Sequence, residues 1–390
     1  MADVEAMRNG YPDLIVVGAG VLGAFHAYFA ARRGWSVLLL DRNSRPNGAS
    51  TRNGGLLARA SIEPQGEWAA HAAATRAIYQ ALQAEGELSL RASGSLFLAQ
   101  SEAEAAVLAE LAAAPAWREH CGFLSAAEAQ ARHPWLRRDG CVGALRFPDD
   151  LSFDPQTLLP RLLERWIVSG LLRYRPCTNV VGVTAGGLRA TIHSADGAMF
   201  HAARVLICGG ADYNTLFPSR LRASGVRLCK LQMLRTAPQP LGLLPHTLLT
   251  GRSISGYPAF CDCPSFPLLL QELEARQPQG HNIQLLVRQR DDGSVVIGAS
   301  CEQFSLDEAA AQEERTQSAL NAAMLTEARR LVRLHSWELA EHWNSYYLAH
   351  PQLPIVSTVI DSRIQLITGL GSRGMAVAPG YAQANVQSWG

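Results

Sequence analysis

Apolar and polar residues alternate in blocks over the first 41 positions, in an order that predicts a strand, a helix and a second strand. Short continuous apolar runs are typical of strands buried on both faces of a sheet. The first run ends in a glycine-rich turn, the helix ends at Gly34, and the second run ends at Asp41. The three segments are Leu14–Val17, Ala24–Arg33 and Trp35–Leu40. This order is that of a β-α-β unit.

The glycine-rich turn has the spacing Gly-x-Gly-x-x-Gly, which binds dinucleotides between a strand and a helix. Gly18 permits the tight turn, Gly20 lets the backbone approach a pyrophosphate, and Gly23 lets the helix pack on the strand. The helix N-terminus also directs N–H groups toward phosphates. Asp41 lies where an acidic side chain accepts hydrogen bonds from ribose hydroxyls. The residues predicted to bind the dinucleotide are Gly18, Ala19, Gly20, Val21, Leu22, Gly23 and Asp41.

Helices and strands continue to alternate after Asp41, and the pattern changes near residue 226. Before that point, turn residues separate helices at 66–84, 101–114 and 156–168 from strands at 94–100 and 143–147. After it, two long alternating runs flank Asp291-Asp292-Gly293 and predict an antiparallel hairpin. Residues 306–334 are expected to form one long helix.

Two later apolar strands also lead into glycines, at Gly209-Gly210 and at Gly369-Leu370-Gly371, as expected for a chain that returns to the first sheet. The sequence therefore predicts an α/β fold, in which a discontinuous Rossmann-type domain holds an inserted substrate domain of antiparallel β-sheet and helices. The boundaries expected are 1–93, 141–222 and 335–390 for the nucleotide-binding domain, and 94–140 and 223–334 for the inserted domain.

Composition excludes several classes of partner. The 390 residues carry a formal net charge of +1, which gives no electrostatic argument for nucleic acid. No apolar run approaches the roughly 20 residues that span a bilayer, and the N-terminus lacks the pattern of a signal peptide. The eight cysteines are scattered, which favours reduced thiols, no metal site and a cytoplasmic location. Lys230 is the only lysine, and because an ammonium differs chemically from a guanidinium it is a candidate site residue.

The combined pattern resembles the D-amino-acid-oxidase superfamily of flavoenzymes, which includes glycine and sarcosine oxidases. The resemblance covers nearly the whole chain and rests on the first glycine turn, Asp41, the loop Ser50–Gly55, the strand end Ile207–Asp212 and the segment Gly369–Pro379. It implies that the dinucleotide is FAD, held without a covalent bond. The further residues that it implies for the cofactor are Arg42, Ser50, Thr51, Arg52, Asn53, Gly54, Gly55, Gly209, Gly210, Gly371, Ser372, Arg373, Gly374 and Met375.

Within this superfamily, the chain is most similar to the FAD oxidoreductases associated with bacterial phosphonate breakdown. The most specific stretch is Cys229–Pro240, and further matching stretches are Gly94–Ala99, Tyr257-Pro258, Gln284–Gly298 and His350-Pro351. The similarity implies hydride transfer to flavin N5 from 2-aminoethylphosphonate or an N-methylated form, which yields phosphonoacetaldehyde and an amine. The chain departs from these relatives after Gly55, where smaller residues and the charge of Arg59 stand in place of bulky side chains.

Flavin-dependent amine oxidation needs an oriented C–H bond, a neutral amine and exclusion of water, and no catalytic triad. Relatives similar to glycine oxidase hold the substrate carboxylate with an arginine before a proline, whereas residues 344–351 here contain tyrosines and a histidine. We therefore expect other cations and hydroxyls to bind a small anionic amine. The candidates are Arg373, Lys230, Tyr347, His350, Arg235 and Arg288. Each has a structural alternative, such as a surface ion pair for Arg235 or a turn for His350, and only one of Tyr346 and Tyr347 is expected to line the pocket.

Four alternatives remain open at this stage. The first is a glycine, sarcosine or D-amino acid oxidase, and the second is a non-catalytic flavin-binding subunit of a larger dehydrogenase. The third is a tRNA-modifying oxidase, because that branch shares the run Gly369–Gly374, although the low net charge argues against it. The fourth is an NAD or NADP dehydrogenase, for which Arg42 would recognise a 2′-phosphate. Oxygen or another acceptor is expected to take the electrons.

Overall fold

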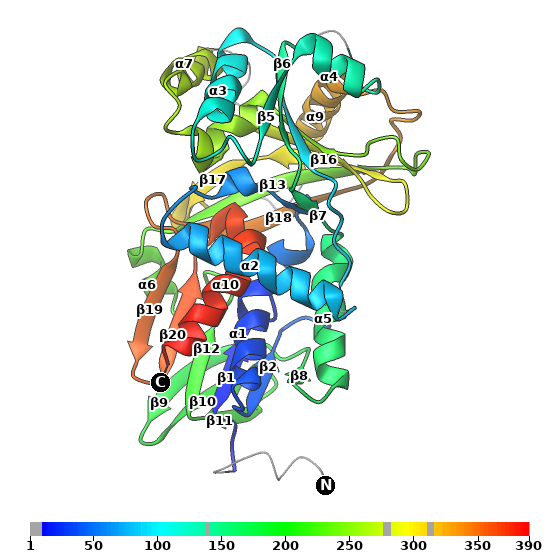
Figure 1. Ribbon diagram of the computed structural model, residues 1–390. Coiled ribbons are helices and arrows are strands. Elements are labelled where there is room, and N and C mark those ends of the chain that lie inside the picture. Colours follow the sequence, from blue (N-terminus) through cyan, green and yellow to red (C-terminus); the bar gives the residue numbers. More distant parts are fainter. Residues whose placement is uncertain (1–9, 87, 138–140, 276–281, 310–315, 390) are drawn as a thin grey trace.

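The computed structural model describes residues 10–86, 88–137, 141–275, 282–309 and 316–389. Two sheets lie at opposite ends of the molecule, and α2 (Glu67–Ala84) crosses between them (Figure 1). A six-stranded sheet has the order β19-β20-β12-β1-β2-β8, and a nine-stranded sheet has the order β17-β13-β16-β15-β14-β4-β6-β5 with β18 also paired to β13. The expected α/β fold is therefore confirmed.

The six-stranded sheet is parallel except at one edge. Its parallel strands are β20 (Ile364–Thr368), β12 (Arg204–Ile207), β1 (Leu14–Val17), β2 (Val37–Leu40) and β8 (Arg173–Arg175), and β19 (Val356–Asp361) runs antiparallel to β20. Side chains of β1 alternate between two cores because successive strand residues point to opposite faces. Leu14 and Val16 pack on one face with the helices α1 (Val21–Arg32), α5 (Pro155–Val168) and α10 (Gly374–Gln387). Ile15 and Val17 pack on the other face with the three-stranded sheet β9 (Val180–Gly186), β10 (Arg189–Ser194) and β11 (Met199–Ala202).

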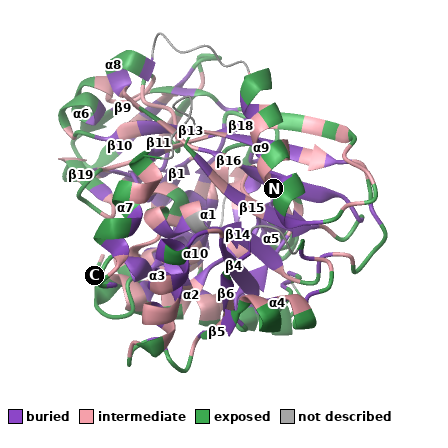
Figure 2. Ribbon diagram, turned by 90° about the horizontal axis from the view of Figure 1, so that it is seen from above, coloured by how far each residue is buried: buried purple, intermediate pink, exposed green. Residues whose placement is uncertain are grey.

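The nine-stranded sheet contains most of the middle of the chain. Its strands are β4 (Ser95–Ala99), β5 (Gly122–Ser125), β6 (Gly143–Phe147), β13 (Arg227–Thr236), β14 (Thr247–Thr250), β15 (Ile283–Gln289), β16 (Val295–Ser300), β17 (Glu302–Ser305) and β18 (Leu339–Ala349). One face packs on α4 (Ala126–Arg132) and α9 (Ser318–Leu331), and part of the other packs on α3 (Glu102–Ala113) and α7 (Phe266–Ala275). Strands of this sheet are largely buried, and the helices turn exposed sides outward (Figure 2).

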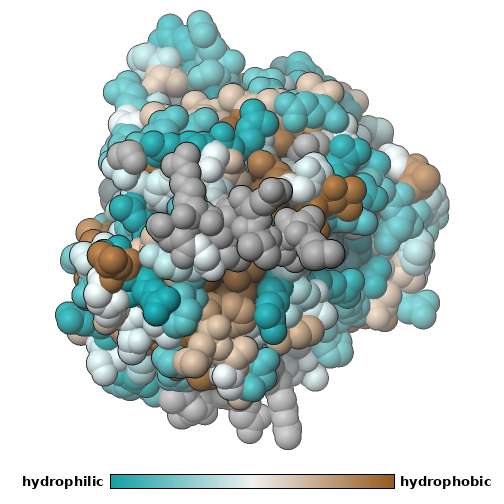
Figure 3. All heavy atoms as spheres, turned by 90° about the horizontal axis from the view of Figure 1, so that it is seen from below, coloured by the Kyte–Doolittle hydropathy of each residue, from teal (hydrophilic) through white to brown (hydrophobic). Residues whose placement is uncertain are grey.

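The smaller elements complete the chain. They are β3 (Leu56–Leu57), which pairs with β7 (Leu151–Ser152), α6 (Pro218–Ala223), α8 (Leu306–Ala309) and the short 3₁₀ helices η1 (Ala49–Thr51), η2 (Arg59–Ser61), η3 (Gly251–Gly256), η4 (Pro258–Phe260) and η5 (Gly371–Arg373). Seen from below, hydrophilic side chains cover much of the surface and hydrophobic ones form separate patches (Figure 3). Within the described part of the chain, none of the helices has both the length and the apolar character needed to cross a membrane.

The long helix expected at 306–334 is wrong. Among the described residues of this range, helical structure is confined to α8 and α9, and residues 316–317 are not helical. Residues 310–315 lie outside the described part. The buried side chain of Gln232 on β13 explains where α9 begins. Its amide oxygen accepts a 2.7 Å hydrogen bond from the Gln317 N–H, and its amide nitrogen donates a 2.7 Å bond to the Gln317 carbonyl. The Gln317 carbonyl also accepts from the Asn321 N–H, so the contact with Gln232 fixes the residue that caps the start of α9.

The strand pairing also bears on the expected domain boundaries. Residues 141–222 and 335–390 were both assigned to the nucleotide-binding domain, but β6 and β18 pair in the nine-stranded sheet. The sheet that a strand joins depends on cross-strand hydrogen bonding, which the local sequence pattern does not record. We propose that the nucleotide-binding domain contains the six-stranded sheet with β9–β11, and that β6 and β18 belong to the inserted domain. The hairpin of β15 and β16, by contrast, lies as predicted.

Helices α2 and α10 approach closely at Gly380, and this contact makes a testable prediction. A Cβ atom at Gly380 would lie 2.1 Å from the carbonyl oxygen of His71. We expect Gly380→Ala to lower the free energy of unfolding by roughly 1–3 kcal/mol, because the helices must move apart. Denaturant unfolding measures this change in the free energy of unfolding. Gly374→Ala in the same helix is the control, since its Cβ would meet only Val21 at 3.9 Å. Equal stabilities of the two variants would contradict the tight contact.

Candidate functional site

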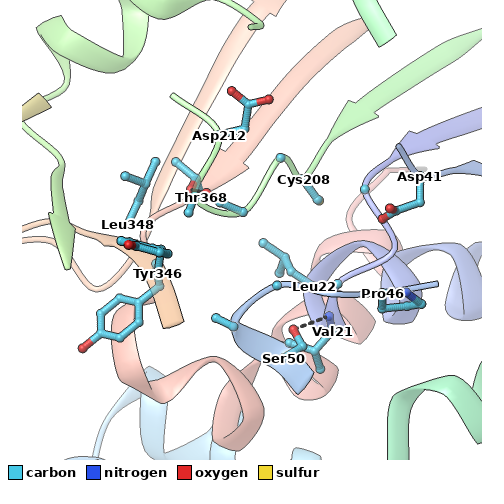
Figure 4. A pocket seen from close by; sticks show the side chains of 18 of the residues that line it. Val21, Leu22, Asp41, Pro46, Ser50, Cys208, Asp212, Tyr346, Leu348 and Thr368 are labelled. Atoms are coloured by element: carbon cyan, nitrogen blue, oxygen red, sulfur yellow. Dashed lines mark hydrogen bonds between the residues drawn. The ribbon is translucent and has the colours of Figure 1, made fainter. Parts of the chain in front are cut away.

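A cavity of about 310 Å³ lies at the carboxyl ends of the parallel strands β1, β2, β12 and β20. Crevices at this edge of a doubly wound sheet are the usual ligand sites of α/β proteins. Asp41 and Pro46 stand on one side of the open space, and Tyr346 and Leu348 stand on the other (Figure 4). We call it the first cavity. Predicted residues in its wall are Gly18, Gly20, Val21, Leu22, Asp41, Arg42, Ser50, Arg52, Gly209, Gly210, Gly371 and Gly374.

The glycines of the first turn have the roles expected of them. Gly18 has a φ of +102°, and a Cβ there would lie 2.2 Å from the carbonyl oxygen of Cys208. A Cβ at Gly23 would lie 2.0 Å from the Gly18 carbonyl oxygen, so α1 packs directly on the turn. At Gly20 the only neighbour within 4 Å is the Ser50 hydroxyl at 3.4 Å, on the side of the cavity. Gly20 has no side chain to cap α1, and the first turn carries no acid, although the Ser50 hydroxyl accepts a 3.0 Å hydrogen bond from the Val21 N–H (Figure 4). An anionic ligand at this helix N-terminus would therefore lie beside the Ser50 hydroxyl.

Asp41 connects the two predicted parts of this site. Its carboxylate is 8% exposed, and it accepts hydrogen bonds of 2.8 Å from the backbone N–H groups of both Ala19 and Asn43. Oδ2 keeps a second lone pair, whereas Oδ1 also accepts a long 3.3 Å bond from the Asn43 side-chain amide, which a ribose hydroxyl can replace. These bonds fix the carboxylate and leave it able to accept from ribose hydroxyls. Ala19 therefore contributes by orienting Asp41 and does not line the cavity. The side chain next to it, Arg42, forms a 2.9 Å ion pair with Asp212.

Several cavity residues were missed by the sequence analysis. They are Asn43, Pro46, Asn47, Gly48, Ala49, Thr178, Asn179, Val180, Cys208, Ala211, Asp212, Leu216, Asn344, Leu348, Ile367, Thr368, Gly369 and Leu370. Tyr346 and Tyr347 both line the first cavity, although only one of them was expected to line the pocket. Thr178 reaches the site because its N–H donates to the carbonyl of Asp41 over 2.8 Å, a pairing between segments far apart in the sequence. Residues at ends of the parallel strands, such as Cys208 and Thr368, were detectable from the strand pattern alone.

A second cavity of about 190 Å³ continues from the first. The two share the wall residues Val21, Ala49, Ser50, Tyr347, Gly371 and Gly374. The second also includes the predicted residues Asn53, Gly54, Gly55, Ser372 and Met375. Its opposite wall comes from the nine-stranded sheet. Strand register places Leu231, Met233, Leu286 and Gly298 on the sheet face that looks toward the six-stranded part. The second cavity therefore lies between the two sheets.

The wall of the second cavity is neutral. Among the described residues that line it, none is charged, and the polar groups are hydroxyls and amides of Ser50, Asn53, Tyr257, Gln284, Ser345, Tyr347 and Ser372. The hydroxyl of Ser345 is buried and has no hydrogen-bond partner within the described part of the chain. Burial raises the pKa of Tyr347 well above its ordinary value, and the Cys229 and Cys301 thiols beside it act in the same direction, so its hydroxyl stays protonated. The cavity therefore offers neutral hydrogen-bonding groups on an apolar wall.

The predicted cations do not line this cavity. Arg373 points away, because its guanidinium lies 3.7 Å from the Glu63 carboxylate and over the Trp68 ring. Lys230 is 3% exposed and alternates with Leu231, so it lies on the other face of β13, opposite Glu302 and Tyr346. The expectation that cations contact the ligand in this pocket is therefore not met by these two side chains. The reason is strand and turn geometry, which residue type does not reveal.

Of the remaining candidates, three lie outside the second cavity and one lines it. Arg235 forms ion pairs with Glu341 at 2.9 Å and Asp292 at 3.6 Å at the far end of β13. His350 shapes a turn, where its Nδ1 accepts from the Gln352 and Leu353 N–H groups. Arg288 donates a 2.7 Å bond to the Gly54 carbonyl and so supports the turn from behind. Only Tyr347 lies in the wall of the cavity.

The two cavities together fit an FAD molecule. The first offers a glycine turn, a helix N-terminus and a fixed acid for an adenosine diphosphate, and the second adds the backbone of Gly54 and the segment Gly371–Met375 for a flat ring. Four predicted cofactor residues lie outside the walls of the two cavities: Ala19, Gly23, Thr51 and Arg373. Ala19 bonds to Asp41, and Gly23 packs against Gly18. Thr51 donates to the Pro46 and Gly48 carbonyls, and Arg373 pairs with Glu63.

Comparisons with known proteins agree with this geometry. Residues 13–387 match the model of the DAO family, described as FAD dependent oxidoreductase. The fold is similar to glycine oxidase from Geobacillus kaustophilus, with a TM-score of 0.75, 20% identity and coverage of 97% of this chain and 95% of that one. It is also similar to FAD-bound L-α-glycerophosphate oxidase from Mycoplasma pneumoniae, with a TM-score of 0.76, 15% identity and coverage of 97% of this chain and 95% of that one. A third similar structure is iminodiacetate oxidase from Chelativorans sp. BNC1, with a TM-score of 0.67, 19% identity and coverage of 96% and 95%.

Proposed function

The chain belongs to the DAO family of FAD-dependent oxidoreductases, and we propose on this premise that it oxidises the C–N bond of a small amine held in the second cavity. The observation that carries the proposal is the neutral, largely apolar second cavity, which joins the first at Val21, Ser50, Gly371 and Gly374. FAD as the cofactor sets aside the alternative of an NAD or NADP dehydrogenase. The charge of Arg42, which suggested NADP, is offset by Asp212 at 2.9 Å.

FAD, when bound, would supply the oxidising power by accepting a hydride, one proton with two electrons, from the carbon next to the substrate nitrogen. The protein orients the substrate and excludes water from the second cavity. Arg288 holds the Gly54 carbonyl, which fixes the turn at the cavity, and Leu56, Leu231, Met233 and Leu286 keep water away. We expect FAD to be held without a covalent bond. The cysteine in the wall, Cys208, is fully buried at the nucleotide end, and burial raises its pKa, which keeps the thiol protonated and unreactive.

The uncharged wall bears on the state of the substrate nitrogen. Burial in a weakly polar site disfavours a charged ammonium and so lowers the pKa of a bound amine. A neutral amine has the lone pair that stabilises the oxidised carbon. The Ser345, Gln284 and Tyr347 side chains can then orient the amine through hydrogen bonds.

For the substrate itself, we propose 2-aminoethylphosphonate or an N-methylated form. Its oxidation gives an imine, which water hydrolyses to phosphonoacetaldehyde and ammonia or methylamine. The support is that the stretches Cys229–Pro240, Tyr257-Pro258 and Gln284–Gly298, which carry the sequence resemblance, supply Leu231, Met233, Tyr257, Gln284 and Leu286 to the cavity wall. In the absence of a wall cation among the described residues, hydroxyl and amide groups would have to bind the phosphonate. Glycine, sarcosine and D-amino acids are the alternative substrates, and a non-catalytic flavin subunit is the alternative of another class.

An anaerobic flavin-reduction screen tests the proposal. The purified holoprotein is mixed with 2-aminoethylphosphonate, its N-methyl form, glycine, sarcosine, D-alanine and simple N-methyl amines, and loss of flavin absorbance is followed. We expect reduction by amines, fastest with the aminophosphonates. Faster reduction by glycine, sarcosine or D-alanine would replace the phosphonate proposal, and no reduction by any amine would favour the non-catalytic subunit.

Ser345→Ala localises the reaction to the second cavity. Because the Ser345 hydroxyl has no partner within the described residues, its removal should leave the stability unchanged. The dissociation constant of the reducing substrate should rise by about 2-fold to 13-fold, the value of one hydrogen bond. Ser362→Ala, on the exposed turn after β19, is the control. Equal substrate affinity in both variants would place the amine elsewhere.

A further inference from the structure

A third cavity, of about 350 Å³, lies behind the wall of the second. It is bounded by α2, η2, the start of α10 and the segment that contains Trp117 and His120. The wall is thin, because adjacent residues face the two cavities. Leu56 lines the second and Leu57 the third, and Met375 lines the second and Ala376 the third. The third cavity is therefore close to the reaction site but separate from it.

The third cavity has a charged side that the second lacks. Arg59 and Arg76 both line it, and the Arg59 Nε is buried without a hydrogen-bond partner among the described residues. Arg76 uses one of its guanidinium nitrogens to donate to the Asp149 carbonyl over 2.7 Å. Burial lowers the pKa of Arg76, and the charge of Arg59 lowers it further. Two guanidinium groups held near each other in this way repel, and an anion between them would relieve the repulsion.

Asp150 lies beneath these arginines and does not neutralise both. Its fully buried carboxylate accepts a 2.8 Å bond from the backbone N–H of Arg59 and a 2.7 Å bond from the Ser95 hydroxyl. Burial raises the pKa of Asp150 to about 6, so it carries one negative charge at neutral pH. The other carboxylate in the wall, Glu63, faces Arg373 at 3.7 Å. The Asp149 carboxylate also acts on Arg76, but Asp149 is exposed, so solvent screens its charge. The buried Arg59 Nε therefore remains as a charged donor for a ligand.

The rest of the wall is apolar and built from small side chains. Ala69, Ala72, Ala73 and Ala77 of α2 leave the space open, and the Trp117 ring, which is 4% exposed, closes one side. We propose that the third cavity is a second ligand site, which binds a small organic monocarboxylate with its carboxylate on Arg59 and Arg76 and its short apolar chain against α2 and Trp117. The site does not depend on the proposed substrate, and its occupant would press on Leu57 and Ala376, one residue from the wall of the second cavity.

Calorimetric titration of the FAD-loaded protein with sodium butyrate tests this proposal, with 1-butanol as the uncharged probe of the same shape. We expect butyrate to bind and butanol to bind at least about tenfold more weakly, because a hydrogen-bonded ion pair is lost. Arg59→Gln and Arg76→Gln should each weaken butyrate binding by about tenfold or more. Arg118→Gln is the matched control, since Arg118 is exposed near Trp117 and outside the cavity wall.

Two further variants keep the result decisive if the glutamine variants unfold. Arg59→Lys keeps the charge and should retain part of the affinity, and Ala73→Phe fills the cavity without changing its charge and should abolish binding. Flavin absorbance is recorded in parallel, because a ligand of the second cavity would perturb it directly and compete with the amine. The proposal is overturned if butyrate does not bind, if Ala73→Phe binds it as the unaltered protein does, or if butyrate binds only in competition with the amine.

Discussion

Replacing Gly18 with alanine is expected to give a protein that is purified with little or no FAD. The new Cβ would lie 2.2 Å from the Cys208 carbonyl oxygen, at a residue whose φ of +102° already disfavours a side chain. Together these effects should lower the free energy of unfolding by about 2–5 kcal/mol. Because Gly18 lines the first cavity, the backbone shift also distorts the phosphate site. The flavin-to-protein absorbance ratio and denaturant unfolding measure the two losses.

Gly34→Ala separates the collision from the strained backbone. Gly34 also has a positive φ, +85°, but a Cβ there would meet no atom within 4 Å. We expect this control to lose only about 1–2 kcal/mol, the cost of the left-handed conformation, and to retain its full complement of FAD. A Gly18→Ala protein that retains as much flavin as Gly34→Ala would contradict the close contact of β1 with the end of β12.

Asp41→Ala is expected to weaken the binding of FAD by about 100-fold or more. Hydrogen bonds to a charged group contribute roughly 1.5–3 kcal/mol each, and the carboxylate can accept from two ribose hydroxyls. It also accepts from the Ala19 and Asn43 N–H groups, so its removal loosens the glycine turn. Titration of the apoprotein with FAD, followed by flavin fluorescence, gives the dissociation constant. Asp41→Asn keeps one acceptor oxygen, so its dissociation constant for FAD should lie between those of the unaltered protein and Asp41→Ala.

Asp361→Ala is the matched control for Asp41. Asp361 also ends a strand and accepts from the backbone N–H two residues later, but it is exposed and lies outside both cavities. We expect the affinity of the Asp361→Ala variant for FAD to be unchanged. If Asp41→Ala bound FAD as tightly as this control, the ribose would have to lie elsewhere, and the assignment of the first cavity would be wrong.

The cofactor end of the site was predictable because its chemistry is local. A glycine turn, a helix N-terminus and an acid at the end of the next strand follow one another in the chain, and their roles depend on backbone conformation and short-range packing. Gly18, Gly23 and Asp41 accordingly lie where the sequence predicts them. The Rossmann-type sheet follows from the same apolar strands, because strands buried on both faces admit few other arrangements.

The substrate end was predicted less well because side-chain direction there depends on distant partners. The sequence identified Lys230, Arg235 and Arg373 as cations near the reaction site, but it contains no record of which face of β13 is turned inward or that Glu63 lies beside Arg373. Likewise, Gln232 holds Gln317, 85 residues away and directly before the start of α9, through two hydrogen bonds that the local pattern does not record.

The amino-acid sequence by itself thus determined the fold class and predicted the dinucleotide site, because both depend on periodicity and on glycines close together in the chain. Only the tertiary structure decided that the second cavity is neutral, that β6 and β18 join the larger sheet, and that Arg59 and Arg76 face a cavity of their own. The physical reason is that strand register and ion pairing join residues far apart in the sequence. A shift of one position in register turns every side chain of a strand to the other face.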